Sequence, residues 1–146
     1  MIVGLDTNFL AYAEGINDEA RKMRALALIK HLKPQDVRLP VQVLGELFRV
    51  LTKKMSRTTG QARQAVLYWQ DLFPVCDTTH AAFKSAMDLA QAHRLSIWDA
   101  LILSVAAHND CRILLSEDMQ DGFVWQGVTV VNPFAPSASD FLGQIP

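Results

Sequence analysis

Acidic residues stand at four positions in this chain where a carboxylate is useful for chemistry. Asp6 directly follows the short apolar run Ile2–Leu5, and Asp118 follows a second apolar run. Glu46 lies at the border of the apolar face of a predicted helix, and Asp99 lies in the first turn of a very apolar helix. In one cleft, two such charges about 4 Å apart would repel by about 4 kcal/mol at an effective dielectric constant of about 20. Such a cluster persists at neutral pH only if protons or a cation neutralise it.

The donor chemistry of this cluster favours a hard cation. Carboxylate oxygens without histidine or thiolate ligands select Mg²⁺ or Mn²⁺ over zinc. The four histidines share no ligand spacing, and the two cysteines form no CxxC pair. A metal held by carboxylates can lower the pKa of a bound water and stabilise an in-line displacement at phosphorus. The chemistry implied is phosphodiester hydrolysis.

Each acid also has a simpler explanation, and the residues alone leave both open. Asp6 could cap the helix that follows it. Asp99 could be the third helical residue of a capping box begun by Ser96, and Glu46 could form an ion pair with Arg49 or Lys53. Asp118 could be an ordinary turn residue. The joint interpretation is preferred because two of the predicted strands end at an acid.

Apolar periodicity predicts the elements that must position these acids. The predicted helices span residues 18–33, 40–54, 59–73, 79–93 and 97–108, and the predicted strands span 2–5, 37–39, 75–76, 112–115 and 128–131. Strands that alternate with helices or helix pairs are typical of an α/β fold, here a three-layer α/β/α sandwich with a mostly parallel sheet of four or five strands. A parallel sheet aligns the carboxyl ends of its strands at one edge, where ligands bind.

Size and composition fit one domain over residues 1–146, with 133–146 as a loosely packed tail. The formal net charge of −1 provides no global basic field, so binding of nucleic acid needs a local patch or a metal. Two cysteines without a metal-type spacing indicate a reduced, cytoplasmic protein. No signal segment or membrane span is expected.

Taken in order, the motifs resemble the PIN-domain ribonucleases, and most closely the VapC-type toxin of bacterial toxin–antitoxin pairs. The resemblance covers nearly the whole chain and rests on Asp6-Thr7-Asn8, Glu46, Trp98-Asp99-Ala100-Leu101-Ile102 and Leu115-Ser116-Glu117-Asp118. It implies cleavage of single-stranded RNA that depends on Mg²⁺ or Mn²⁺. It also implies a homodimer and inhibition by a cognate antitoxin bound near the cleft.

The resemblance further assigns the family's acidic quartet to Asp6, Glu46, Asp99 and Asp118. Asp6, Asp99 and Asp118 are expected to hold the metal, because strand ends and a helix start are rigid placements. Glu46, with its longer side chain, is expected to position or deprotonate the attacking water.

The supporting polar residues follow from the same resemblance. Ser116 is expected to support the site, and Thr7 and Asn8 are expected to lie near the metal. Asp121 is an optional further acid, for which an ordinary turn residue is the preferred interpretation. Glu117 is expected to be exposed to solvent.

Cations follow Glu46 closely in the sequence, at Arg49, Lys53, Lys54 and Arg57. Arg49 and Lys53 lie roughly on the side of the helix that carries Glu46, so they could lead RNA phosphates into the cleft. A solvated helical face is the simpler and preferred interpretation. Trp98 is expected to pack in the core rather than to stack on a base.

Other functions fit the residues less well. A haloacid-dehalogenase-like phosphatase needs an Asp-x-Asp after the first strand, and Asn8 stands at the second acidic position. A response-regulator receiver needs a phosphoacceptor aspartate after its central strand, but the predicted strand 37–39 ends at Pro40 without one. A nucleotide-binding P-loop is not supported either, because its motif is absent from the sequence. Another Mg²⁺-dependent phosphoryl-transfer hydrolase, or a binding module that has lost catalysis, remains as an alternative.

Overall fold

A six-stranded sheet forms the centre of the computed structural model, which describes residues 1–136 and 138. The strands are β1 (Val3–Leu5), β2 (Val37–Pro40), β3 (Val75–Cys76), β4 (Ile113–Leu115), β5 (Val124–Trp125) and β6 (Val128–Val131). Their order across the sheet is β3-β2-β1-β4-β6-β5. All neighbouring strands are parallel except β5 and β6, which are antiparallel.

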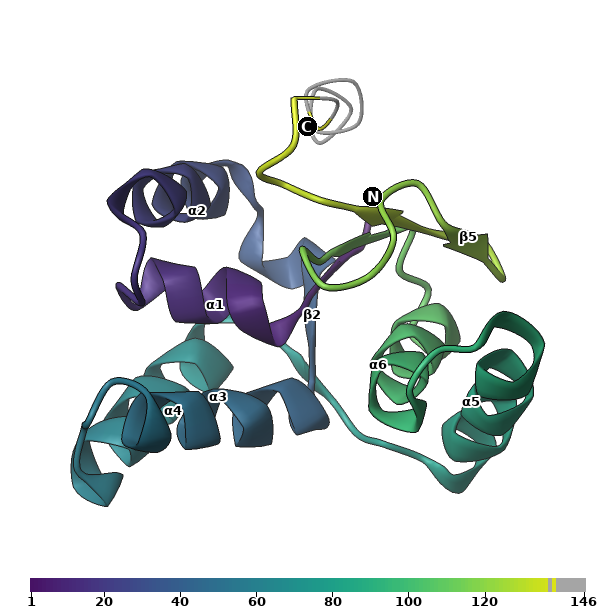
Figure 1. Ribbon diagram of the computed structural model, residues 1–146, viewed down its shortest axis with the longest axis horizontal. Helices are drawn as coiled ribbons and strands as arrows, with labels where there is room; N and C mark the ends of the chain where they lie inside the picture. Colours follow the sequence, from purple (N-terminus) through teal and green to yellow (C-terminus); the bar gives the residue numbers. More distant parts are fainter. Residues whose placement is uncertain (137, 139–146) are drawn as a thin grey trace.

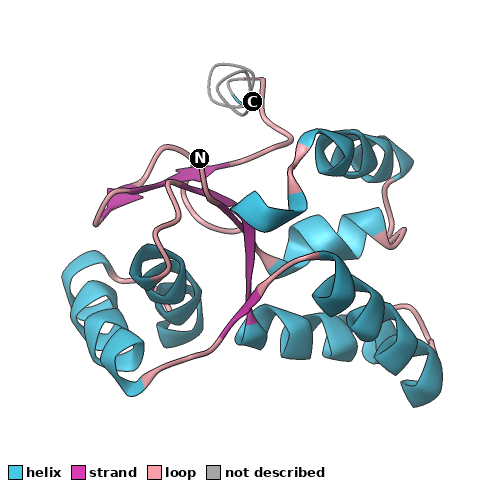
Figure 2. Cartoon of the chain, turned by 180° about the vertical axis from the view of Figure 1, so that it is seen from behind, coloured by secondary structure: helices cyan, strands magenta, loops and turns pink. Residues whose placement is uncertain are grey.

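Helices cover both faces of this sheet. They are α1 (Thr7–Ala13), α2 (Glu19–His31), α3 (Val41–Lys53), α4 (Thr59–Leu72), α5 (His80–His93) and α6 (Ile97–His108), with a 3₁₀ turn η1 (Pro34–Asp36) before β2. Figure 1 shows α1 to α4 on one side of the strands and α5 with α6 on the other, and the view from behind shows the same layers (Figure 2). The predicted three-layer α/β/α architecture is confirmed. Within the described part of the chain, no helix is long and apolar enough to cross a membrane.

The sheet has one strand more than the sequence predicts. β5 is only two residues long and pairs with β6 through a hairpin whose turn residues, Gln126 and Gly127, have φ values of 47° and 83°. Two consecutive positive φ values are typical of the tight turns that match the twist of a hairpin. Two residues are too few to show the alternation of apolar and polar side chains that reveals a strand in the sequence. Val124 of this edge strand is 61% exposed.

The central strands β1 and β4 are completely buried, as expected for parallel strands with helices on both faces. Their register places Leu5 opposite Leu115, and the backbone N–H of Asp6 donates to the carbonyl of Leu115 at 3.0 Å. The chain leaves β1 for β2 on one side and later enters β4 on the other. The carboxyl ends of β1 and β4 therefore flank a topological switch point, the usual place for a ligand in a parallel sheet.

Local signals explain where the helices nearest this edge begin. The Asp6 side chain accepts a hydrogen bond from the backbone N–H of Thr7 at the start of α1, and Ser96 accepts one from Asp99 in α6. Pro40 ends β2 and directly precedes α3, where its fixed φ angle and missing N–H are tolerated. Short strand-to-helix connections thus hold the first turns of α1 and α3 at the edge of the sheet, and a short loop leads from α5 into α6.

The segment after β6 packs more closely than the sequence suggests. Pro133 is buried, and its carbonyl accepts a hydrogen bond from Arg24 Nε at 3.1 Å. The Phe134 ring lies 6.5 Å from the ring of Phe9 and 5.1 Å from that of Tyr12, measured between centroids. The beginning of the expected loose tail is therefore attached to α1 and α2, whereas residues 137 and 139–146 lie outside the described residues.

We expect the buried side chains of β4 to contribute strongly to the free energy of unfolding. Leu114 is fully buried in β4, so Leu114→Ala should lower the free energy of unfolding by about 2–5 kcal/mol because it leaves a cavity. Urea denaturation followed by circular dichroism measures the change. Val124→Ala on the exposed edge strand is the matched control and should change stability by no more than about 0.5 kcal/mol. Equal losses in the two variants would contradict this account of the core.

Candidate active site

A cavity of about 560 Å³ opens at the carboxyl ends of β1 and β4. Segments far apart in the sequence line it, and they bring together the acids Asp6, Glu46, Asp99 and Asp118 with the polar residues Thr7 and Asn8. The four acids come from the end of β1, from α3, from the first turn of α6 and from the segment after β4. The structure therefore places the whole predicted quartet around one space.

Asp6 is the most buried of these acids, with only 2% of its surface exposed. One carboxylate oxygen caps α1 through the Thr7 N–H at 2.7 Å, and the other accepts a hydrogen bond from the Ser116 hydroxyl at 2.6 Å. Burial raises the pKa of Asp6 to about 6, against the lowering effect of these two hydrogen bonds, and the charges of Asp118 and Asp99 raise it further. Desolvation is the largest cause, because it disfavours the charged form.

Glu46 contacts polar side chains rather than the cations that follow it in α3. Its Oε2 accepts a hydrogen bond from the Thr7 hydroxyl at 2.8 Å, and its Oε1 lies 3.4 Å from the Gln42 side-chain nitrogen. The ion pairs found among residues 1–136 and 138 do not include Glu46. Thr7 thus links Glu46 to the first turn of α1, next to Asp6.

Asp99 and Asp118 complete the acidic lining from opposite parts of the chain. The backbone N–H of Asp99 is capped by the Ser96 hydroxyl at 3.1 Å, and a hydrogen bond from the Ser96 side chain also lowers the pKa of the Asp99 carboxyl. Asp118 accepts a hydrogen bond from the Asn8 amide at 2.6 Å. The pKa of each carboxyl is raised, chiefly by burial and then by a neighbouring acid, which is Glu46 for Asp99 and Asp99 for Asp118.

Burial and, to a smaller extent, the neighbouring acids raise the pKa values of Asp6, Asp99 and Asp118. The described side chains contain no group of three acidic, histidine or cysteine residues already arranged to hold a metal ion. The lining nevertheless supplies oxygen donors without a thiolate or imidazole, which suits Mg²⁺ or Mn²⁺. Because Mg²⁺ keeps several waters, a few carboxylates plus substrate oxygens are sufficient. The residues present therefore fit a hard divalent cation.

Positive side chains form another part of the same lining. Arg49 and Lys53 of α3 both border the cavity, together with Lys54 at the end of that helix. The sequence pattern favours a solvated helical face for this group, and Lys54 is not among the predicted site residues. Lys54 lies close enough to Asp118 to lower the pKa of its carboxyl, although burial and the neighbouring acids outweigh this effect. Acidic and cationic side chains thus line the same cavity, and we call the exposed cations Arg49, Lys53 and Lys54 its cationic lip.

The remaining predicted residues are Ser116, Asp121 and Trp98. Ser116 is fully buried beneath the site and donates to Asp6. Asp121 accepts a hydrogen bond from the Asn132 N–H at 2.9 Å and is not part of the cavity lining, so we leave it out of the proposed metal site. Trp98 is 62% exposed, so the expectation that it packs in the core is wrong.

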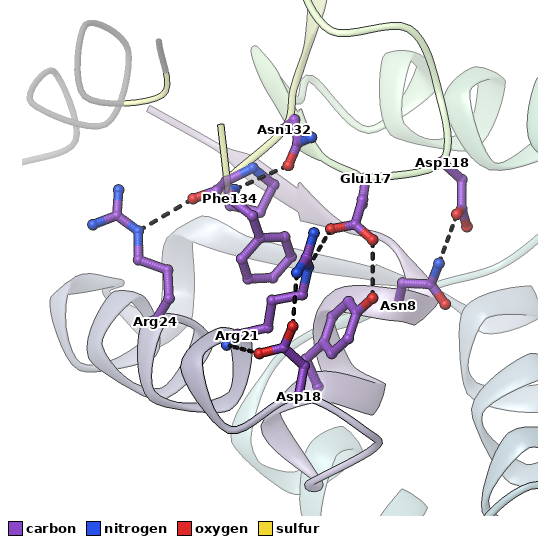
Figure 3. A network of polar contacts seen from close by, with 10 residues as sticks. Asn8, Asp18, Arg21, Arg24, Glu117, Asp118, Asn132 and Phe134 are labelled. Carbon is purple, nitrogen blue, oxygen red and sulfur yellow. Dashed lines mark hydrogen bonds and ion pairs between the residues drawn. The ribbon is translucent and has the colours of Figure 1, made fainter. Parts of the chain in front are cut away.

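Glu117 also differs from the prediction. Its side chain is only 22% exposed, and it binds Arg21 and Tyr12 rather than solvent (Figure 3). No local pattern in the sequence reveals this residue, because Arg21 lies 96 positions away. The one feature of the sequence that draws attention to Glu117 is its position directly before Asp118.

The raised pKa of Asp6 leads to a prediction about stability without metal. The native state holds this proton up to about pH 6, whereas an unfolded aspartate releases it near its ordinary pKa of 3.8. Unfolding therefore becomes easier as the pH rises from about 4 to 6, and the cost at neutral pH is about 3 kcal/mol. Asp6→Asn, which can still cap α1, should stabilise the protein at pH 7.5 in EDTA and lose this advantage near pH 4.

Thermal unfolding from pH 4 to pH 8 measures this effect. Asp71→Asn is the control, because Asp71 is an exposed acid on α4 that does not line the cavity. A melting temperature for Asp6→Asn that stays equal to that of the wild type at every pH would contradict the cost assigned to the burial of the Asp6 charge.

Known proteins share this architecture. No curated protein sequence matches the chain. Among solved structures, VapC20 of Mycobacterium tuberculosis, described as a sarcin–ricin-loop-cleaving toxin, has a TM-score of 0.67 at 20% identity over 80% of this chain and 91% of its own. A toxin–antitoxin complex from Klebsiella pneumoniae has a TM-score of 0.68 at 20% identity over 90% and 98%. FitAcB of Neisseria gonorrhoeae has a TM-score of 0.66 at 19% identity over 91% and 99%.

At these identities the solved structures establish the fold, and the sequence itself decides the family. The family model described as PIN domain matches residues 3–120. This range contains β1, β4 and all four acids that line the cavity. The chain therefore belongs to the PIN domain family.

Proposed function

We propose that this protein is a Mg²⁺- or Mn²⁺-dependent endoribonuclease that cleaves phosphodiester bonds in single-stranded or structured RNA. The observation that carries the proposal is the meeting of four carboxylates from separate segments in one cavity, with the pKa values of three of them raised. Membership of the PIN domain family supports it. A cationic lip beside the acids suits a polyanionic substrate.

The position of each acid indicates its role in the proposed cleavage reaction. Asp6, Asp99 and Asp118 would hold the metal, directly or through water, because Asp6 directly follows β1, Asp99 lies in the first turn of α6 and Asp118 lies in the segment after β4. Glu46 would position or deprotonate the attacking water, and the Thr7 hydroxyl orients one of its oxygens. When bound, Mg²⁺ or Mn²⁺ supplies a lowered pKa for a coordinated water and charge stabilisation at the phosphoryl oxygens.

The same proposal extends to biological role. The solved neighbours include toxin–antitoxin complexes and complexes with promoter DNA, such as VapBC2 of Rickettsia felis. We propose that this chain is the toxin of such a pair, that it forms a homodimer and that a cognate antitoxin inhibits it. Cys76 and Cys111 are free buried thiols, which agrees with the cytoplasmic location proposed for it.

Removal of a metal-binding carboxylate should abolish RNA cleavage and growth inhibition. Asp6→Asn and Asp99→Asn should each lack the Mn²⁺-dependent cleavage shown by the wild type, and Glu46→Gln should lower kcat by about 100-fold or more because a general base is lost. Incubation with tRNAs and rRNA in Mg²⁺ or Mn²⁺, followed by mapping of the 5′ and 3′ ends, measures this and identifies the substrate.

Asp71→Asn serves again as the matched acidic control and should remain active. Full metal-dependent cleavage by Asp6→Asn would refute the assignment. Hydrolysis of phosphate monoesters without RNA cleavage would favour a phosphatase, and RNA binding without turnover would favour a silent binding module.

The cationic lip should contact RNA phosphates. Lys53→Ala should reduce the slope of log affinity against log salt concentration by about 1, because one phosphate contact disappears. Filter binding by the inactive Asp6→Asn protein at several salt concentrations measures the slope. Lys84→Ala, an exposed cation on α5 outside the cavity, should leave it unchanged. An unchanged slope in Lys53→Ala would indicate the solvated face preferred from the sequence.

A further inference from the structure

We propose that Glu117 is a positioning residue that holds Asp118 at the cavity through Arg21 and Tyr12. The proposal rests on the proposed function, because Asp118 is one of the carboxylates expected to bind the metal. It assigns a role to a network on α1 and α2 that does not itself line the cavity.

The segment after β4 is fastened at three successive residues. Ser116 donates to Asp6 at 2.6 Å, and Asp118 accepts from Asn8 at 2.6 Å. Between them, Glu117 accepts the Tyr12 hydroxyl at 2.9 Å with one oxygen and Arg21 Nε at 2.7 Å with the other. Figure 3 shows Glu117 and Asp118 reaching to different partners from the same loop.

Arg21 is itself held from several directions. Its guanidinium bonds to Asp18 at 2.7 Å and to Glu117. It also lies 5.5 Å from the ring centroids of both Tyr12 and Phe134, within the range of a cation–π contact. A planar cation fixed by two carboxylates and two rings has little rotational freedom. It therefore offers Glu117 a rigid anchor.

This anchor matters for Asp118 because the two residues are adjacent and lie outside any helix or strand. The neighbouring backbone N–H groups of Ser116 and Met119 donate to the Val131 carbonyl at 3.0 Å and to the Ser116 hydroxyl at 3.4 Å. Glu117 and Asp118 lie between these two points, so their side-chain contacts contribute to the direction in which Asp118 points. Asn8 supplies one such contact and Glu117 supplies two. Partners that orient a metal ligand typically change metal affinity or activity by about 10- to 100-fold when they are removed.

If the network only stabilised the fold, substitution of its carboxylates would have different effects on metal binding. Arg21 joins α2 to the loop, and its other carboxylate, Asp18, caps α2 without touching the loop. If the network serves only to attach α2 to the loop, loss of the Glu117 charge should lower the melting temperature in EDTA and leave the Mn²⁺ dependence and kcat unchanged. If it positions Asp118, the loss at Glu117 should also weaken Mn²⁺ binding, whereas loss of the Asp18 charge should not.

The test compares Glu117→Gln with Asp18→Asn. Glutamine keeps the volume and an acceptor for Tyr12 but presents a donor to Arg21 Nε, whereas asparagine at 18 retains the helix cap. For each protein, we would measure the melting temperature in EDTA, the Mn²⁺ concentration that gives half of the maximal shift in melting temperature, and kcat with RNA. We expect Glu117→Gln to raise the half-saturating Mn²⁺ concentration about 10-fold and to lower kcat by a similar factor.

Asp18→Asn should match the wild type in Mn²⁺ dependence and kcat. Unchanged Mn²⁺ dependence and kcat in Glu117→Gln would overturn the proposal, as would equal losses in both variants that follow their melting temperatures in EDTA. If Glu117→Gln does not fold, Arg21→Lys replaces it, since lysine keeps the charge but loses the planar donor geometry. An unchanged Mn²⁺ dependence there would also overturn the proposal. A wild-type protein without any Mn²⁺ shift or cleavage would refute the proposed function itself, and this inference with it.

Discussion

The pairing of β1 with β4 is the constraint on which the candidate active site depends. Leu5 lies opposite Leu115, so the next residues, Asp6 and Ser116, leave the sheet side by side and form a hydrogen bond of 2.6 Å. Both strands are fully buried, and a slip by one residue would exchange the faces of every side chain. The tight packing of the core therefore fixes the register, and the register fixes the position of the most buried acid.

The burial of these acids lowers the stability of the fold but favours the binding of a cation. Burial of Asp6 raises its pKa to about 6, and the nearby acids add to the effect. Hydrogen bonds from Ser116 and Thr7 offset only part of this cost. A cavity whose carboxylates are incompletely neutralised is destabilising on its own, but it is for the same reason receptive to a divalent cation. Activity in exchange for stability is a common property of functional sites.

Structural and functional explanations of the same residue turn out to be compatible. Asp6 caps α1 with one oxygen while its other oxygen meets Ser116. At Asp99, the Ser96 hydroxyl caps the backbone N–H at the start of α6, and the same residue lines the cavity. A helix cap and a strand end are rigid places, which is why an acid needed at a fixed point is found there. Sequence patterns cannot separate the two roles, because both require the same residue at the same position.

The helices, five of the six strands and the acids that the fold gathers can be predicted from the amino-acid sequence. These features follow from apolar periodicity, capping residues and strand ends, all of which are local. The side-chain contacts and the exposure of individual residues follow only from the folded chain: Glu46 contacts Thr7 rather than Arg49, Glu117 binds Arg21, and Trp98 is exposed. Periodicity reports which side of an element is apolar, but a hydrogen-bond partner depends on distance in space between segments far apart in the chain. The two-residue strand β5 was missed because its pairing, and not its pattern, makes it a strand.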